Sequence, residues 1–241
     1  MSINDVDIKE VGDLLCIELS RSQAGNALNL AMCEAMVASL IELPEHIKVV
    51  KISAQGENFC TGRDSPMPGL GPHPSGEKIR TTVALPPLSL YDAVKNCPVP
   101  VVSIVRGNAF GAGCALACVC DMTFAGQTAW FEVNEMDRDI PPTLVMTALL
   151  GKVPIKTLAH LVLSREKISS MEAYEVGLIR KVVEDEQLEA AADQFIQKML
   201  TNSAVSLKAV KQFLKFAPEM SSVAFSSYAG HLAGTALSTK F

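Results

Sequence analysis

The sequence lacks an excess of positive charge. It has 21 Lys and Arg against 26 Asp and Glu, which gives a formal net charge of −5 at pH 7. An acidic chain offers no broad electrostatic surface for nucleic acid or for an anionic membrane, so we expect neither as a partner. Any contact with a phosphate group must therefore be local.

Long hydrophobic runs are also missing. The charge-free stretch 109–120 is too short and too rich in Gly and Ala to span a bilayer, and no basic-then-apolar leader opens the chain. Hydrophobic residues still make up 49% of the 241 residues and charged residues 20%, which indicates a globular protein with a sizeable core. We expect a cytoplasmic protein.

The cysteines lack the paired spacing of a zinc site. There are seven, an odd number, and most lie in apolar stretches: Cys16, Cys33, Cys60, Cys97, Cys114, Cys118 and Cys120. Cys114 and Cys118 are one helical turn apart, but no His or second pair lies near them in the sequence. We therefore predict reduced core thiols and no metal site.

Hydrophobic periodicity predicts alternating strands and helices. Strands are expected at 6–8, 14–19, 49–53, 99–105, 122–125 and 130–133, helices at 28–40, 88–94 and 114–120, and a surface loop at 65–76. From residue 143 onward the periodicity is helical. This order predicts an α/β fold with a core of stacked ββα units at 1–185 and a helical C-terminal region at 186–241, both parts of one structural unit.

Two glycine turns each follow a predicted strand, at 62–64 and at 107–113. Because Gly has no Cβ, such turns can expose backbone N–H groups at a defined point. Two N–H groups aimed at one oxygen would form an oxyanion hole, although tight packing alone also explains the glycines. Residues 107–113 do not match the dinucleotide motif, and residues 71–78, with Glu77 where Lys is needed, do not match a P-loop.

The chain resembles the crotonase, or enoyl-CoA hydratase/isomerase, family in five segments that follow the family's order and spacing. These are RSQAGNALN (21–29), NFCTGRD (58–64), RGNAFGAGC (106–114), FEVNE (131–135) and AYEVGLI (173–179). The resemblance implies a crotonase-type spiral of repeated ββα units with a C-terminal helical trimerisation region, in a homotrimer or a dimer of trimers. It also implies an acyl-CoA thioester as partner, with CoA part of the substrate and no separate cofactor.

The resemblance further implies a set of site residues. By motif position, the backbone N–H groups of Arg63 and Ala112 would hold the thioester oxygen, and Glu135 would carry a proton. Positions expected around the substrate and CoA are Asn26, Ala27, Gly62, Asp64, Gly111, Gly113, Ala115 and Lys211. Lys211 matches the family's C-terminal Lys and could meet the nucleotide end, but an ordinary solvated helix Lys is the alternative.

The number of carboxylates bears on the reaction. Hydratases of the family use two, and here the first position is Ala115, so only Glu135 is left, preceded by Asn134 where Pro is usual. One carboxylate suffices to move a proton between two carbons, as a β,γ-to-α,β double-bond isomerase does. The Val133-Asn134-Glu135 run also resembles monofunctional enoyl-CoA isomerases, whereas Thr143 replaces the Asp of dienoyl-CoA isomerases.

Other interpretations stay open at this point. The same oxyanion hole could serve hydration, decarboxylation or hydrolysis of a thioester. Ala115, the lack of a basic residue before Asn26, and the charges around Glu135 also fit a degenerate member of the family that only binds acyl-CoA or assembles with other subunits. In that case Glu135 would be a solvated loop carboxylate.

Overall fold

A seven-stranded sheet forms the centre of the structure, a computed structural model that describes residues 2–3, 5–64 and 73–239. The strands lie in the order β1 (Ser2–Ile3), β2 (Val6–Val11), β3 (Leu14–Leu19), β4 (Val49–Ala54), β5 (Val101–Val105), β7 (Met122–Gly126) and β10 (Lys181–Val183). Neighbours from β3 to β10 are parallel, and β1, β2 and β3 are antiparallel. A second sheet joins β6 (Asn108–Phe110), β8 (Trp130–Glu132) and β9 (Ile168–Ser169).

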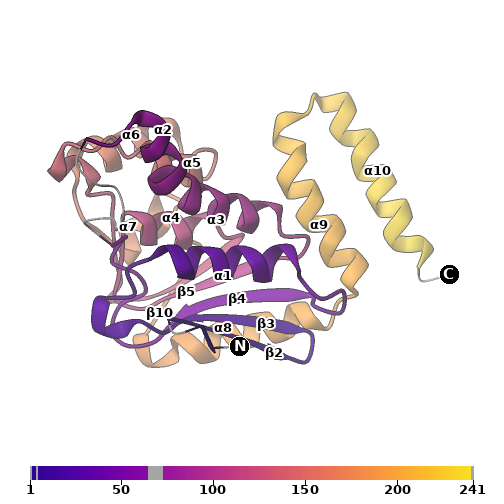
Figure 1. Ribbon diagram of the computed structural model, residues 1–241. Helices are drawn as coiled ribbons and strands as arrows, with labels where there is room; N and C mark the ends of the chain where they lie inside the picture. The colour runs from indigo at the N-terminus through magenta and orange to yellow at the C-terminus, as the bar shows by residue number, and fades with distance from the viewer. Residues whose placement is uncertain (1, 4, 65–72, 240–241) are drawn as a thin grey trace.

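Helices cover both faces of the large sheet. In Figure 1, α1 (Leu30–Ile41) and α3 (Leu85–Asn96) lie on one face, and α8 (Leu188–Leu200) lies on the other. Every residue of β5 is buried, as expected of a central parallel strand enclosed by two helical layers. Leu188, Ala192 and Ile196 of α8 join a cluster with strand residues such as Val49 and Val102.

Most of the remaining elements surround the end of the sheet where the chain leaves the parallel strands, whereas the last, η5 (Ala217–Glu219), lies between the two C-terminal helices (Figure 1). The others are η1 (Ser22–Ala24), α2 (Gly76–Ile79), the π-helical turn η2 (Arg80–Ala84), α4 (Ala112–Val119), η3 (Glu135–Arg138), α5 (Thr143–Leu149), α6 (Ile155–Ser164), α7 (Ser170–Glu175) and η4 (Asp185–Gln187). Within the described ranges, no helix is long and apolar enough to cross a membrane. The same ranges hold no group of three or more side chains placed to bind a metal ion.

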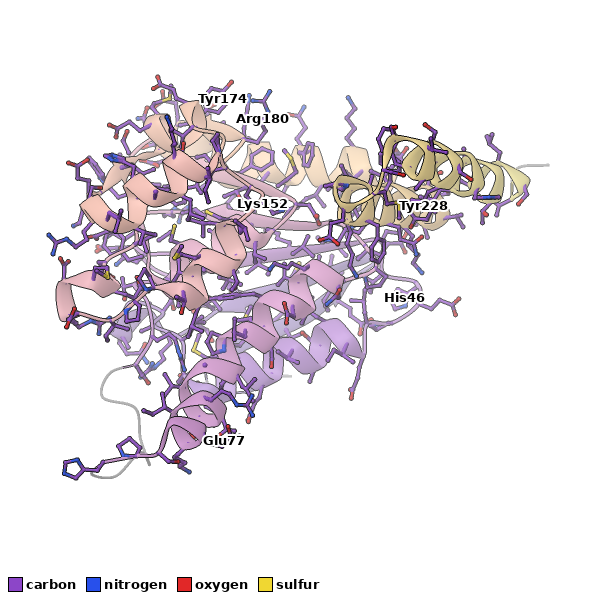
Figure 2. All side chains as sticks on the ribbon, turned by 90° about the horizontal axis from the view of Figure 1, so that it is seen from above. His46, Glu77, Lys152, Tyr174, Arg180 and Tyr228 are labelled. Carbon is purple, nitrogen blue, oxygen red and sulfur yellow. The ribbon has the colours of Figure 1, made fainter. Side chains whose placement is uncertain are left out.

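The last two helices form a hairpin, and the first of them is held to the core through Leu207 and Lys211. Figure 1 shows α9 (Ala204–Phe216) and α10 (Ser222–Ser238) as a hairpin that extends beyond the sheet. Tyr228, labelled in Figure 2, joins the two helices through ring contacts with Phe213 and Phe216, each at 6.4 Å between centroids. No residue of α10 is buried, and Val223 is 80% exposed. The domain boundary at residue 186 stays a prediction, since α8 packs on the sheet and α9 is held to the core through Leu207 and Lys211.

The α/β fold and its principal elements are confirmed. Asn29 is the N-cap of α1 and accepts a hydrogen bond from the Met32 N–H at 2.8 Å, so the helix begins at Leu30. All seven cysteines are free and six are buried, and burial raises the pKa of Cys33 to about 11 and that of Cys60 to about 12. Such thiols are mostly protonated at neutral pH and are poor nucleophiles.

Besides the two-residue β1, three short strands were not anticipated. β6 lies within the segment expected to be a glycine turn, and β9 and β10 lie in the part expected to be helical. Each has only two or three residues, too few to show a period of two, and each forms by pairing with a strand distant in sequence. The expected loop at 65–76 ends earlier, because Gly76 begins α2, and its residues 65–72 lie outside the described part of the chain.

Candidate active site

A cavity of about 510 Å³ opens beside the N-terminus of α4. Four segments form its wall: the turn after β4, the helical stretch through η2 and α3, the start of α4, and the chain from η3 into α5. Its lining residues are Thr61, Gly62, Arg63, Asp64, Val83, Pro87, Tyr91, Gly111, Ala112, Asn134, Glu135, Arg138, Ile140, Pro141, Pro142, Leu144 and Val145. Polar groups gather at the two glycine turns and η3, and the rest of the wall is mainly apolar.

Parallel pairing brings the two glycine turns together. Cys60 pairs with Ala109, and the Phe110 N–H donates to the Cys60 carbonyl at 2.9 Å. Beyond this bridge, Arg63 and Ala112 both line the cavity. The approach is close, because a Cβ on Gly113 would overlap the Cys60 carbonyl oxygen. Gly113 therefore allows α4 to start against the first turn, and it does not line the cavity.

The backbone N–H groups of both turns are oriented by their neighbours. Ala112 is the first residue of α4, so its N–H has no acceptor within the helix and lies at the positive end of the helix dipole. Beside Arg63, the Gly62 carbonyl accepts from the Leu28 N–H at 2.9 Å and the Asp64 N–H donates to the Leu28 carbonyl at 3.1 Å. Alternation along an extended backbone then turns the Arg63 N–H away from Leu28.

The Arg63 side chain braces the cavity wall. Its Nη1 donates to the Val83 carbonyl at 2.5 Å and so links the first glycine turn to η2. Burial lowers the pKa of the guanidinium. The side chain thus has a contact of its own, separate from the backbone N–H predicted to meet the substrate.

Glu135 is a partly buried carboxyl group in the cavity wall. It begins η3, and its Oε2 is buried without a hydrogen-bond partner in the described part of the chain. Burial raises the pKa of Glu135, the nearby Arg138 charge lowers it, and the Glu132 charge raises it further. Such a group can exist in both protonation states near neutrality more readily than a solvated carboxyl can.

The turn that carries Glu135 is regular despite its charges. Asp139 occupies a position where Gly is common in the family, and it adopts the left-handed conformation itself, with φ of +54°. The Ile140 N–H then donates to the Glu135 carbonyl at 3.2 Å and closes the turn. Asp137 pairs with Arg165 at 3.4 Å, outside the cavity wall. The crowding of charges therefore leaves Glu135 in the cavity.

Asp64 and Ala27 are engaged within the protein. Arg21 Nη1 donates to Asp64 Oδ1 at 2.7 Å and to the Ala27 carbonyl at 2.9 Å. This pairing raises the pKa of Arg21. Asp64 lines the cavity with its charge already balanced, which agrees with a structural role, and Ala27 does not line it.

The structure corrects the expectation that Asn26 lies against the substrate or CoA. It is fully buried, with φ of +54°, and its Nδ2 donates to the carbonyls of Gln55 and Asn58 at 2.8 and 2.7 Å. Its Oδ1 accepts from the Arg21 N–H at 2.9 Å. Asn26 therefore holds three backbone segments together and has no surface to offer a substrate.

Lys211 and Ala115 also lie away from the cavity. Lys211 is only 4% exposed, and its Nζ pairs with both carboxylate oxygens of Asp121 at 2.6 and 2.8 Å and donates to the Val94 carbonyl at 3.3 Å. Lys211 and Asp121 therefore form an internal ion pair that fixes α9 to the core. The Lys211 ammonium group is not available to a nucleotide phosphate. Ala115 is fully buried in the core.

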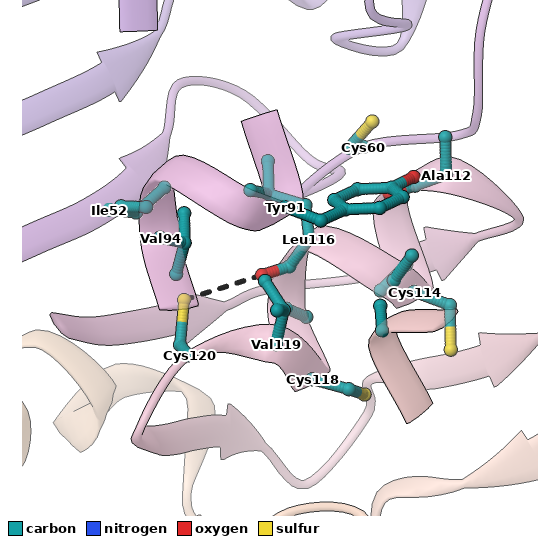
Figure 3. Packing of buried hydrophobic residues seen from close by; sticks show 14 of the residues in the cluster. Ile52, Cys60, Tyr91, Val94, Ala112, Cys114, Leu116, Cys118, Val119 and Cys120 are labelled. Carbon is teal, nitrogen blue, oxygen red and sulfur yellow. Dashed lines mark hydrogen bonds between the residues drawn. The ribbon is translucent and has the colours of Figure 1, made fainter. Parts of the chain in front are cut away.

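Sequence reasoning did not find the apolar wall. Tyr91, Pro87 and Val83 come from the helical stretch after the undescribed residues, and Leu144 and Val145 come from α5. In Figure 3 the Tyr91 ring points its hydroxyl toward Ala112, and this hydroxyl donates to the Ala112 carbonyl at 3.5 Å. Burial raises the pKa of Tyr91 well above the usual value. Apolar residues on a helix face predict burial, but they do not tell a cavity wall from the core.

Comparisons with known proteins give consistent matches over most of the chain. The model of the enoyl-CoA hydratase/isomerase family matches residues 10–231. The chain is 31% identical over 214 residues to enoyl-CoA hydratase domain-containing protein 3, mitochondrial, of Rattus norvegicus, covering 87% of this chain and 70% of the relative. It is 31% identical over 211 residues to 2,3-dehydroadipyl-CoA hydratase of Escherichia coli, covering 86% and 80%.

Solved structures share the fold. An enoyl-CoA hydratase from Bacillus anthracis has a TM-score of 0.90 at 23% identity, covering 98% of this chain and 92% of that one. A Thermobifida fusca protein in complex with CoA has a TM-score of 0.89 at 24% identity, covering 98% and 93%.

Proposed function

Since this chain belongs to the enoyl-CoA hydratase/isomerase family, we propose that it is an acyl-CoA enzyme that shifts the double bond of a β,γ-enoyl-CoA to the α,β position. The family relationship supports a CoA thioester as substrate, as does the CoA bound to the Thermobifida fusca protein of the same fold. The choice of isomerisation rests on the residues of this chain.

One observation carries that choice. Among the residues that line the described cavity, the carboxyl groups are Glu135 and Asp64, and Asp64 is paired with Arg21. Glu135 is therefore the one unpaired carboxyl group of this wall. The position from which a second carboxylate would act is Ala115, buried in the core. A single proton carrier suits the transfer of one proton between two carbons of the same substrate.

The mechanism uses the two backbone N–H groups and one carboxylate. The thioester oxygen accepts hydrogen bonds from the Arg63 and Ala112 N–H groups, which stabilise the negative charge that develops on it. Glu135 as the carboxylate removes a proton from the carbon next to the thioester, and an enolate forms. The protonated Glu135 then returns the proton to the γ carbon, so the double bond moves and the carboxylate is restored.

A direct assay tests the proposal. Purified protein is mixed with trans-3-hexenoyl-CoA, and the conjugated 2-enoyl thioester is followed by its ultraviolet absorbance and by mass spectrometry. We expect conjugation without a gain of water, and a loss of about 100-fold or more in kcat for Glu135→Gln, in line with the usual contribution of a general acid and base. Water uptake by a 2-enoyl-CoA, without isomerisation, would instead establish a hydratase like the named relatives.

We also propose a homotrimer or a dimer of trimers located in the cytoplasm, whereas the Rattus norvegicus relative is named a mitochondrial protein. The exposed apolar residues of the α9–α10 hairpin support assembly, because a helix with apolar side chains and no buried residue is stabilised by a partner surface. Sedimentation equilibrium is expected to give three or six times the 25.8 kDa chain mass. A monomer at micromolar concentration would refute this part.

A further inference from the structure

The cavity wall contains a cation that the isomerase mechanism does not use. Arg138 lines the cavity at the last position of η3 and is solvent-exposed at its edge. Near it the wall is formed by Ile140, Pro141 and Leu144, which are apolar. A guanidinium beside an apolar wall indicates that this part of the cavity recognises more than a hydrocarbon chain.

Among the described residues, no carboxylate forms an ion pair with Arg138. Asp137 pairs with Arg165, and Asp64 pairs with Arg21 at 2.7 Å. Glu135 interacts with Arg138 only through space, and its pKa is raised despite that cation. Across residues 2–3, 5–64 and 73–239, no hydrogen bond or ion pair engages the Arg138 guanidinium. Within these residues, its five donors have no protein acceptor and can meet a ligand.

The position of Arg138 relative to Glu135 sets where that ligand group lies. Residues three apart in a 3₁₀ helix project in the same direction and are separated by about 6 Å along the axis. Glu135 and Arg138 are the first and last residues of η3. Because Glu135 must face the reacting carbons, Arg138 faces a point one turn away from them, within reach of an atom a few bonds along the acyl chain.

The CoA phosphates are a less suitable partner for this cation. The whole length of the pantetheine arm separates them from the thioester sulfur, whereas Arg138 lies within one helical turn of the residue that meets the reacting carbons. An anion at that short range belongs to the acyl group. A carboxylate matches the planar fork of a guanidinium and can accept two hydrogen bonds from it.

We propose that Arg138 is a specificity-determining residue that binds a carboxylate at the far end of the acyl chain, so that the preferred substrates are CoA thioesters of dicarboxylic acids. This inference rests on the proposed acyl-CoA function. It does not depend on which reaction follows, because the recognition requires only that the thioester occupies the oxyanion site beside Glu135.

Binding of saturated thioesters tests the inference apart from catalysis. Glutaryl-CoA and adipyl-CoA are compared by titration calorimetry with pentanoyl-CoA and hexanoyl-CoA, which have the same chain lengths without the terminal carboxylate. We expect at least one dicarboxylic thioester to bind about tenfold or more tightly than its uncharged match, as is usual for a charge-assisted hydrogen bond. None of these ligands can be isomerised, so the result is independent of turnover.

Variants assign the preference to Arg138. Arg138→Met should reduce the ratio of the two affinities to about one, and Arg138→Lys should restore part of it. Arg180→Met is the matched control, since Arg180 is an exposed arginine against the Tyr174 ring, outside the cavity (Figure 2), and it should leave the ratio unchanged. Equal binding of charged and uncharged thioesters by the unmodified protein would overturn the inference while leaving the proposed function intact. A preference that survives Arg138→Met would overturn it too, and failure of every thioester to bind would refute both proposals.

Discussion

The carboxyl group of Glu135 lies against the backbone of Gly111. A Cβ built on Gly111 would be 2.6 Å from Glu135 Oε1 and 3.5 Å from Asn134 Oδ1. Gly111 also has φ of +49° and precedes the first residue of α4. The absence of a side chain at this residue therefore leaves room for the carboxyl group beside the backbone of the second glycine turn.

Gly111→Ala should lower kcat strongly. The new methyl group would displace the Glu135 carboxyl group, and a misplacement of about 1 Å can cost 100-fold in rate. We expect kcat to fall by about that factor or more, with a further loss of about 1–3 kcal/mol in stability from the positive φ. Gly151→Ala is the matched control, because Gly151 has φ of +79° and open space around it. It should show the loss of stability alone, and similar kinetics of both variants would contradict the steric argument.

The acid limb of the pH profile of kcat/KM should lie at a higher pH than an ordinary carboxyl group would give. Only ionised Glu135 can remove a proton, and because burial raises its pKa above 4.5, the acid limb of kcat/KM should lie above pH 4.5. Glu132→Gln removes a charge that raises this pKa and should move the limb to lower pH. Glu166→Gln, which alters an exposed pair with His160 at 3.3 Å, should leave the profile in place. An acid limb at the same pH in Glu132→Gln and in the unmodified protein would argue against this account.

Ionisation of Glu135, which activity requires, should lower the stability of the folded protein. An acid whose pKa is raised on folding binds more protons in the folded state, so the free energy of unfolding decreases as pH rises from 4.5 through the folded pKa. Glu135→Gln should therefore be more stable than the unmodified protein at pH 7, by about 1.4 kcal/mol for each unit of raised pKa, and should gain little at pH 4. Urea unfolding at the two pH values measures this. A Glu135→Gln variant that is less stable than the unmodified protein at pH 7 would show that burial does not disfavour the ionised carboxylate.

Lys211 should contribute to stability and not to CoA binding. Lys211→Met leaves Asp121 without its cation in a largely buried site, and we expect a loss of about 3–5 kcal/mol. The double variant Lys211→Met with Asp121→Asn should recover part of that loss. Lys208→Met, on the same helix, is the control with no expected change. Thermal unfolding and calorimetry with free CoA separate the two roles, and a stable Lys211→Met variant with weakened CoA binding would reverse our conclusion.

Much of the fold and the site's backbone could be anticipated from the sequence. The glycine turns were recognisable because Gly62, Gly111 and Gly113 follow predicted strands, and the structure brings the turns together by parallel pairing. Glu135 was found through its motif, and the structure places it in the cavity wall. Its mechanistic role and those of the Arg63 and Ala112 N–H groups remain predictions. Glycine turns after strands and short motifs are local features, and they leave a pattern that can be recognised in the sequence.

The errors concern partners that lie far away in sequence. Motif position suggested ligand contacts for Asn26 and Lys211, but their actual partners are Gln55, Asn58 and Asp121. No periodicity shows which polar group a buried side chain will meet. The edge strand β10 was missed for a similar reason, since three residues become a strand only by pairing with β7. Tertiary contacts decided each of these cases.

The two oxyanion donors proposed above are main-chain groups whose spacing is set by the pairing of Cys60 with Ala109. Main-chain amides do not ionise in the physiological range, and no replacement at Arg63 or Ala112 other than proline deletes them. Attraction for the thioester oxygen is thus constant from acid to neutral solution, whereas the proton carrier titrates. Ligand affinity and turnover should accordingly have separate pH profiles. The side chains at the two donor positions can also change in evolution while the backbone donors of the oxyanion hole are kept.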